Sequence, residues 1–133
     1  MVDVFCVPPD RVAECWGAVE GLIRPALENS ITDFDMVAAA VCDGRMLLWL
    51  TFDGTRVYSA TVTQLSVSNG KKFCTIVACG GSEMSRWIHL IERIEQFARD
   101  EGCASIVIIG RPGWKKILKQ YNTKRVTLEK ELA

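Results

Sequence analysis

The spacing of apolar residues in the first part of the chain predicts a strand followed by a helix. Residues 2–7 form a short run with strand character, and Pro8-Pro9 closes it because proline cannot continue a hydrogen-bonded ladder. Apolar residues then recur three and four positions apart, which predicts an amphipathic helix that Asp10 caps and that ends near Pro25. The apolar stripe of this helix consists of Val12, Cys15, Trp16, Val19, Leu22 and Ile23.

A second, shorter helix is predicted to begin at Thr32 or Asp33 and to end at Val41. Carboxylates lie in its first turn, where the helix dipole favours them, and alanines make up much of its body. Residues 36–42 also fit a strand that pairs with the next apolar run across Asp43-Gly44, because an Asp-Gly pair between apolar runs is a hairpin signal. The alanines favour the helix.

The middle of the chain changes to the spacing of strands. Residues 46–52, 55–67 and 72–79 are rich in β-branched and aromatic side chains. Asp53-Gly54 and Asn69-Gly70 separate these runs, and both pairs are typical of tight hairpin turns. The pattern predicts a three-stranded antiparallel meander.

A helix and a buried strand are predicted to follow the meander. Residues 82–101 carry apolar side chains on one helical face, and Gly102 stands where a left-handed cap ends a helix. Residues 105–109 are apolar without alternation, which is typical of a central strand covered on both faces and parallel to its neighbour. The strand ending at Cys79, the helix and this strand therefore form a β-α-β unit.

The C-terminal part is predicted to form a short helix over residues 114–121 and an alternating strand over residues 125–132 near the sheet edge. The fold class is α/β (α+β): a mixed, mainly antiparallel sheet of six or seven strands with helices on both faces. No repeat or linker interrupts the chain, so residues 1–133 are predicted to form a single domain.

Composition narrows the classes of function. Sixteen basic residues balance sixteen acidic ones, so we expect no nucleic-acid partner. The apolar runs are shorter than a bilayer span and the N-terminus lacks a signal-peptide pattern, so we expect no membrane partner. One histidine and six cysteines without a C-x-x-C pair argue against a metal site. Reduced core cysteines suit a cytoplasmic, intracellular protein.

The glycine pair Gly80-Gly81 stands between the third strand of the meander and the long helix. Glycines at such a junction let the backbone turn sharply and leave the first helical N–H groups free, which can make a seat for a phosphate. Alternatively, the glycines only turn the chain, and Ser82 caps the helix. Both interpretations remain open from the residues alone.

The order of these elements resembles the GNAT fold, that of the Gcn5-related N-acetyltransferases, over essentially the whole chain. The closing pattern, Gly110-Arg111-Pro112-Gly113-Trp114, then Tyr121-Asn122 and then the alternating residues 126–132, is similar to that of small phage-encoded GNAT-like proteins. The resemblance implies acyl-CoA-dependent N-acyl transfer, with acetyl-CoA as donor and a small-molecule or protein amine as acceptor. It also allows a catalytically inactive binding or structural module, including a virion-associated one, with a homo-oligomer or an assembly partner.

The resemblance also implies where acetyl-CoA would bind. Its pantetheine arm would follow the backbone of Val77 and Cys79, and Trp114 would line the site. The pyrophosphate would lie at the helix-opening loop, formed by Gly80, Gly81, Ser82, Glu83 and Met84. This loop lacks the leading Gln or Arg and the glycine spacing of the family.

The catalytic acid and base of the family have only approximate counterparts in this chain. Leu118 stands where the family commonly has a tyrosine that acts as the acid, so Tyr121 is the substitute candidate. Asp53 is a candidate base that would act through water, although an aspartate before a glycine is more often a turn residue.

Overall fold

A computed structural model describes residues 3–28, 32–81, 87–108, 121–122 and 128–132 of the chain. Its centre is a five-stranded sheet in the order β1-β2-β3-β4-β5. The first four strands are antiparallel, and β5 is parallel to β4. The strands are β1 (Asp3–Cys6), β2 (Leu47–Phe52), β3 (Val57–Ser68), β4 (Lys71–Gly81) and β5 (Ser105–Ile108). The predicted meander and the β-α-β unit are confirmed.

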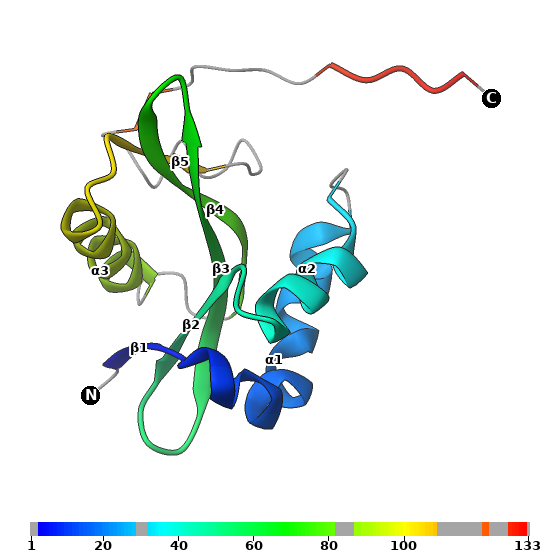
Figure 1. The fold of residues 1–133 in the computed structure, drawn as a ribbon. Helices are drawn as coiled ribbons and strands as arrows, with labels where there is room; N and C mark the ends of the chain where they lie inside the picture. The colour runs from blue at the N-terminus through cyan, green and yellow to red at the C-terminus, as the bar shows by residue number, and fades with distance from the viewer. Residues whose placement is uncertain (1–2, 29–31, 82–86, 109–120, 123–127, 133) are drawn as a thin grey trace.

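Helices cover both faces of the sheet (Figure 1). Helices α1 (Val12–Leu27) and α2 (Phe34–Cys42) lie on one face, and α3 (Trp87–Asp100) lies on the other. Each face has its own apolar core, since side chains alternate across the pleated strands. The α1-side core includes Val19, Ile23, Val41, Leu48 and Val62. The α3-side core includes Trp49, Cys74, Ile76, Leu90 and Ile94.

The first helix differs from its prediction at both ends. Asp10 does not cap it but lies in a 3-10 helix (Pro9–Arg11), and α1 begins after Arg11 without a side-chain cap. Pro25 lies inside the last turn of α1. A proline removes only its own N–H, and burial of Leu27 in the α1-side core holds the final residues in helical conformation.

The second helix is confirmed, and the alternative hairpin over residues 36–42 is wrong. Asp33 is the N-cap of α2, where its side chain accepts a hydrogen bond of 3.3 Å from the Met36 N–H. At the other end, the Asp43 N–H donates to the Ala39 carbonyl at 3.0 Å, as a helix terminus requires.

The end of α3 is built as predicted around Gly102, which has φ +79°. The Gly102 N–H donates to the Arg99 carbonyl at 3.0 Å, and the Cys103 N–H donates to the Ala98 carbonyl at 2.9 Å. These two bonds define a Schellman cap, which directs the chain from α3 into β5.

Four further predictions need correction. Within the described residues β5 lies at the end of the sheet and not at its centre, and the count is five strands. Residues 128–132 are not in a strand, because no sheet partner lies beside them among the described residues, and Leu128 and Leu132 are 90% and 87% exposed. Cys6 and Cys42 are exposed and not core residues. The predicted helix over residues 114–121 falls almost entirely outside the described residues.

No helix among the described residues is both long enough and apolar enough to cross a membrane.

Candidate functional site

The C-terminal half of β4 extends beyond the residues whose pairing with β5 is described. The two strands pair from Phe73 with Ser105 to Ile76 with Ile108. Strand β4 then runs on to Gly81, where it pairs with Ser59 of β3. Among the described residues, therefore, residues 77–81 are paired on the β3 side only. A strand edge of this kind presents backbone N–H and C=O groups to a ligand.

A β-bulge in β4 directly follows the last described pair with β5, that of Ile76 with Ile108. Pairing between β3 and β4 steps from Val62 with Ala78 to Thr63 with Ile76, so Val77 is an extra residue on β4. A bulge bends a strand and increases its twist. It also resets the side-chain alternation, because Val77 and Ala78 both contact the α1-side core.

The glycine pair ends β4 and does not form the predicted turn. Gly80 pairs with Ala60 and Gly81 with Ser59 as the last residues of the strand. A Cβ on Gly80 would collide with the Leu22 carbonyl of α1, and a Cβ on Gly81 would lie 2.6 Å from the Ser59 Cα. Gly81 also has φ +149°, which other residues rarely adopt. Close packing of β4 against α1 and β3 thus explains both glycines.

Cys79 is the reactive side chain nearest to this end of β4. Its Sγ accepts a hydrogen bond of 3.0 Å from the Thr61 hydroxyl on β3. Burial raises the pKa of the Cys79 thiol to about 11, and the Thr61 bond offsets this only in part. The side chain is therefore a neutral thiol at neutral pH, and a weak nucleophile.

Four predicted cofactor-binding residues cannot be placed. Ser82, Glu83, Met84 and Trp114 lie outside the described residues. Their roles, like those of Val77, Cys79, Gly80 and Gly81, stay predictions.

Asp53 holds the turn between β2 and β3. Its carboxylate accepts hydrogen bonds from the Tyr58 hydroxyl at 2.7 Å and from the N–H groups of Thr55 and Arg56, both at 2.8 Å. The Tyr58 bond, followed by the two backbone bonds, lowers the pKa of Asp53 to about 2. A carboxylate stabilised in this way is a weak base, so the geometry supports its turn role and lends no support to the predicted catalytic role.

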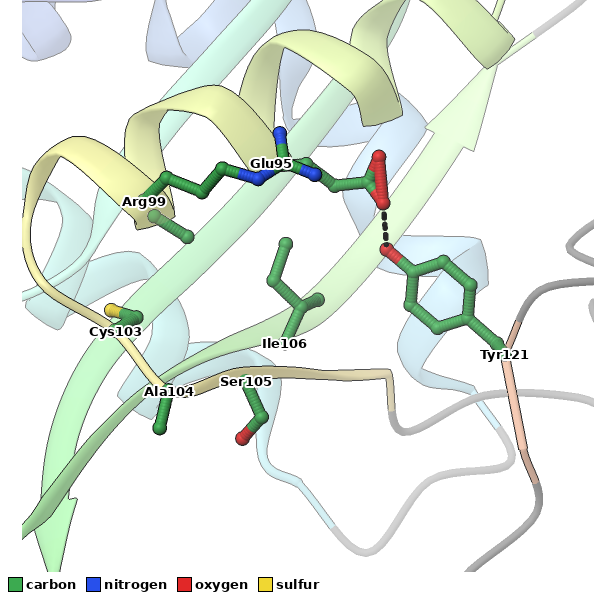
Figure 2. Close-up of a pocket in the computed structure, with 8 residues that line it drawn as sticks. Glu95, Arg99, Cys103, Ala104, Ser105, Ile106 and Tyr121 are labelled. Atoms are coloured by element: carbon green, nitrogen blue, oxygen red, sulfur yellow. Dashed lines mark hydrogen bonds between the residues drawn. The ribbon is translucent and has the colours of Figure 1, made fainter.

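Tyr121 lies on the α3 side of the sheet, where it packs against the α3-side core. Its hydroxyl donates a hydrogen bond of 2.9 Å to Glu95 Oε2 (Figure 2). Burial, and then the Glu95 carboxylate, raise the pKa of Tyr121 far above its usual value. The phenol is therefore a poor proton donor, and the predicted catalytic role of Tyr121 gains no support here.

A cavity of about 330 Å³ surrounds this tyrosine (Figure 2). Ser105 and Ile106, which line it, are the β5 residues that pair with the first half of β4. The cavity therefore lies beside the part of β5 that pairs with Phe73 and Cys74, away from residues 77–81 of β4. Its lining residues are Glu95, Ala98, Arg99, Cys103, Ala104, Ser105, Ile106 and Tyr121.

Sequence patterns do not reveal this cavity. Glu95 and Arg99 lie one helical turn apart on α3, beside its apolar stripe, a spacing that places them on one side of the helix. That spacing is a weak signal, because solvent-exposed helix faces show it as often. The contact with Tyr121 depends on where the chain returns after β5, which no local pattern reveals.

Comparisons with known proteins place the fold. Neither a family model nor a curated protein matches the chain. Among solved structures, an aminoglycoside acetyltransferase from an uncultured soil metagenomic sample, in complex with sisomicin, superposes with a TM-score of 0.70 at 11% identity, covering 99% of this chain and 97% of that one. A GNAT family acetyltransferase from Staphylococcus aureus has a TM-score of 0.66 at 11% identity, with 98% of both chains covered.

A third neighbour is a predicted acetyltransferase with acetyl-CoA from Clostridium acetobutylicum. Its TM-score is 0.66 at 9% identity, and 100% of this chain and 96% of that one are covered. The protein therefore has the GNAT fold, as its element order indicates. The likeness to phage-encoded members stays a prediction.

Proposed function

We propose that the protein is an acyl-CoA-dependent N-acyltransferase that binds acetyl-CoA along the free edge of β4. The observation that supports it most is the bulge at Val77, where β4 bends directly after Ile76, the last β4 residue with a described partner on β5. An extended pantetheine arm carries amide groups, and in this proposal the edge of residues 77–81 that faces away from β3, called here the free edge of β4, pairs with them in the manner of an added strand.

The glycines support this placement indirectly. Because Gly80 and Gly81 have no side chains, the end of β4 packs closely on Leu22 and Ser59, and its backbone is held in a fixed position. A fixed backbone loses little conformational entropy when a ligand binds to it. The pyrophosphate would then lie just beyond Gly81, at Ser82, Glu83 and Met84.

The chemistry proposed for this site is acyl transfer within a ternary complex. The acceptor amine attacks the thioester carbonyl carbon, the new C–N bond forms, the C–S bond breaks, and the thiol leaves with the proton that the amine gives up. Backbone N–H groups near the bulge are suited to stabilise the carbonyl oxygen as it gains charge. Cys79, as a buried neutral thiol, takes no covalent part.

Neither Asp53 nor Tyr121 is assigned the proton transfer in this proposal. Hydrogen bonds lower the pKa of Asp53, and burial together with the Glu95 carboxylate raises the pKa of Tyr121, so both pKa values lie far from neutral pH. General acid and base groups work best when their pKa lies near the working pH. Solvent water is the proposed relay, which takes the proton from the amine and returns one to the leaving thiolate.

The proposed acceptor is an amine, and two of the structurally similar proteins suggest which classes of amine to test. One neighbour binds sisomicin, and another is described as a glucosamine-6-phosphate N-acetyltransferase from Arabidopsis thaliana. We therefore propose a panel of aminoglycosides, amino sugars and peptide amines as first acceptors for an assay of thiol release.

Thermal unfolding with increasing acetyl-CoA tests the proposal first. A ligand that binds only the folded protein stabilises it by about 2.7 kcal/mol at a hundredfold excess over Kd, so the melting temperature should rise steadily with concentration. ADP and free pantetheine, each tested alone, should give smaller shifts because each covers part of the site. No shift with saturating acetyl-CoA would refute the enzyme proposal.

A second candidate function is a GNAT-like binding module without catalysis. The engagement of Asp53 and Tyr121 in structural hydrogen bonds favours it. A protein of this kind would show the thermal shift with acetyl-CoA and would release no thiol with any amine of the panel.

A further inference from the structure

The α3-facing side of β3 carries hydroxyl groups where a buried strand face ordinarily carries apolar side chains. Ser59, Thr61 and Thr63 occupy successive positions on this face, and each residue is at most 1% exposed. A buried hydroxyl group costs free energy unless it finds a hydrogen-bond partner. Each of the three has a partner, and those of Thr61 and Thr63 include the two sulfur atoms of β4.

Two hydroxyl–sulfur bonds join β3 to β4. The Thr61 hydroxyl donates to the Cys79 Sγ at 3.0 Å. The Thr63 hydroxyl accepts the indole N–H of Trp49 at 2.9 Å. It also hydrogen-bonds to the Cys74 thiol, and this bond partly offsets the rise that burial causes in the pKa of Cys74. Each sulfur atom of β4 is therefore held by one threonine of β3.

The bulge is what puts both sulfur atoms on one face of β4. Cys74 and Cys79 are five positions apart, and in a regular strand residues an odd number of positions apart point to opposite faces. Val77 and Ala78 both contact the α1-side core, so the alternation is reset between the two cysteines. Both cysteines consequently contact the α3-side core, where the threonines lie.

The two bonds lie on either side of the bulge and match only its present position. Thr61 lies opposite Cys79 beyond the bulge, and the ladder on the other side of it begins with Thr63. A bulge one position later along β4 would bring Ala78 opposite Thr61, and one position earlier it would bring Val77 opposite Thr63. Neither side chain can accept a hydrogen bond, so a buried hydroxyl group would lose its acceptor at a cost in free energy.

We propose that Thr61 and Thr63 are positioning residues, whose bonds to the sulfur atoms of β4 hold the bulge at Val77. A strand pair keeps most of its backbone hydrogen bonds when a bulge moves by one position, so buried polar groups that have a single set of partners select one register. The bulge in turn bends β4 and orients its free edge. The use of that edge for acetyl-CoA rests on the proposed function, whereas the control of the register by the two threonines does not.

Removal of the Thr61 hydroxyl tests the proposal with little change in side-chain volume. Thr61→Val loses the bond to Cys79, so β4 should occupy more than one register. NMR spectra of isotope-labelled protein should then show doubled or broadened amide signals for residues 76–79. Thr61→Ser keeps a hydroxyl and should restore one set of signals. A single sharp set in Thr61→Val, with the cross-strand contacts of the wild type, overturns the proposal.

The hydroxyl pair of Thr51 and Ser59 supplies the matched control. The two oxygens are 2.7 Å apart, and both residues are fully buried, but the pair joins β3 to β2 instead of β4. Thr51→Val/Ser59→Ala removes both hydroxyl groups, so no buried donor of the pair is left without a partner. The amide signals of residues 76–79 should remain single. Doubled signals in this control would overturn the assignment of the register to Thr61.

The role of Thr63 is tested from its sulfur partner, because Thr63→Val would also leave the Trp49 N–H without its acceptor. Thr61→Val/Cys74→Ala removes one member of each hydroxyl–sulfur bond. This double variant should show a larger share of the second register than Thr61→Val alone. Equal shares in the two variants would overturn the role of Thr63.

Titration with acetyl-CoA then connects the register to the proposed function. Apparent affinity falls with the fraction of molecules in the binding-competent state, so the double variant should bind about tenfold more weakly if about one molecule in ten keeps the bulge at Val77. A purely structural role of the threonines would lower the melting temperature and leave the affinity of the folded protein unchanged. A wild type that does not bind acetyl-CoA would refute the proposed function, whereas a single register in the variants would overturn the present inference, so the two failures are distinguishable.

Discussion

Hydrogen bonds to neighbours determine what the polar side chains near the end of β4 can do. Asp53 accepts from Tyr58 and two backbone N–H groups, and Thr61 donates to Cys79. The first set lowers the pKa of Asp53, while burial raises that of Cys79. The carboxylate is thus a weak base and the thiol a weak nucleophile. For this reason we assign the proposed binding to backbone groups of β4 and to neither side chain.

The bonds of Asp53 should appear as pH-dependent stability. Its folded pKa of about 2 lies below the ordinary aspartate value of 3.8, so its stabilising effect is complete above that value and is lost as the pH falls towards 2. Asp53→Asn should therefore lower the urea midpoint at neutral pH, and the difference from wild type should shrink through this acid range. Tyr58→Phe should reproduce part of the loss. An equal difference at all pH values would contradict the assignment.

Gly80 should be intolerant of even the smallest side chain. A Cβ there would collide with the backbone carbonyl of Leu22, and backbone atoms cannot move aside cheaply. Gly80→Ala should therefore destabilise the protein by about 1–3 kcal/mol, measured by urea unfolding.

Gly17→Ala is the matched control, since Gly17 lies in α1 and a Cβ added there would meet no atom within 4 Å. Alanine is the better helix former, so this change should stabilise the protein by about 0.5–1 kcal/mol. If Gly80→Ala proved as harmless as Gly17→Ala, the close contact between β4 and α1 would be refuted.

Local sequence signals are sufficient to predict most of the helices and strands. Asn69 and Gly70, both with positive φ, form the tight turn between β3 and β4 that an Asn-Gly pair predicts. Gly102 ends α3 for the same local reason. The turn predicted at the glycine pair is wrong, because both glycines pair with β3 as part of β4. Gly80 is needed there because the carbonyl of Leu22, a residue distant in sequence, excludes a side chain. The alternation over residues 125–132 predicts a strand, but alternation alone does not tell whether another strand lies beside these residues to pair with them.

The N-cap of α2 can be tested by mutation, and α2 is the element that the sequence also allowed as a strand. Asp33→Ala removes the side chain that accepts the Met36 N–H, so it should cost about 0.5–2 kcal/mol in urea unfolding. Asp35→Ala is the control: Asp35 lies in the first turn without the cap role, and its loss should cost less. An equal cost for both changes would contradict the capping geometry.

The molecule as a whole is a sheet between two helical layers (Figure 1). The element order predicts this GNAT fold, and solved acetyltransferases superpose on it over nearly their full length. The bulge at Val77 follows from the register between β3 and β4. The sequence could not predict that bulge, because the side-chain pattern does not determine where one strand of a pair takes an extra residue.

Amide hydrogen exchange with and without acetyl-CoA tests the central claim most directly. If the ligand binds along the free edge of β4, exchange should slow in residues 77–81, and β1 and its pairing with β2 should be unaffected and serve as the internal control. Protection limited to the α3–β5 cavity, or no protection at saturating acetyl-CoA, would contradict the placement of the acyl-CoA site on β4.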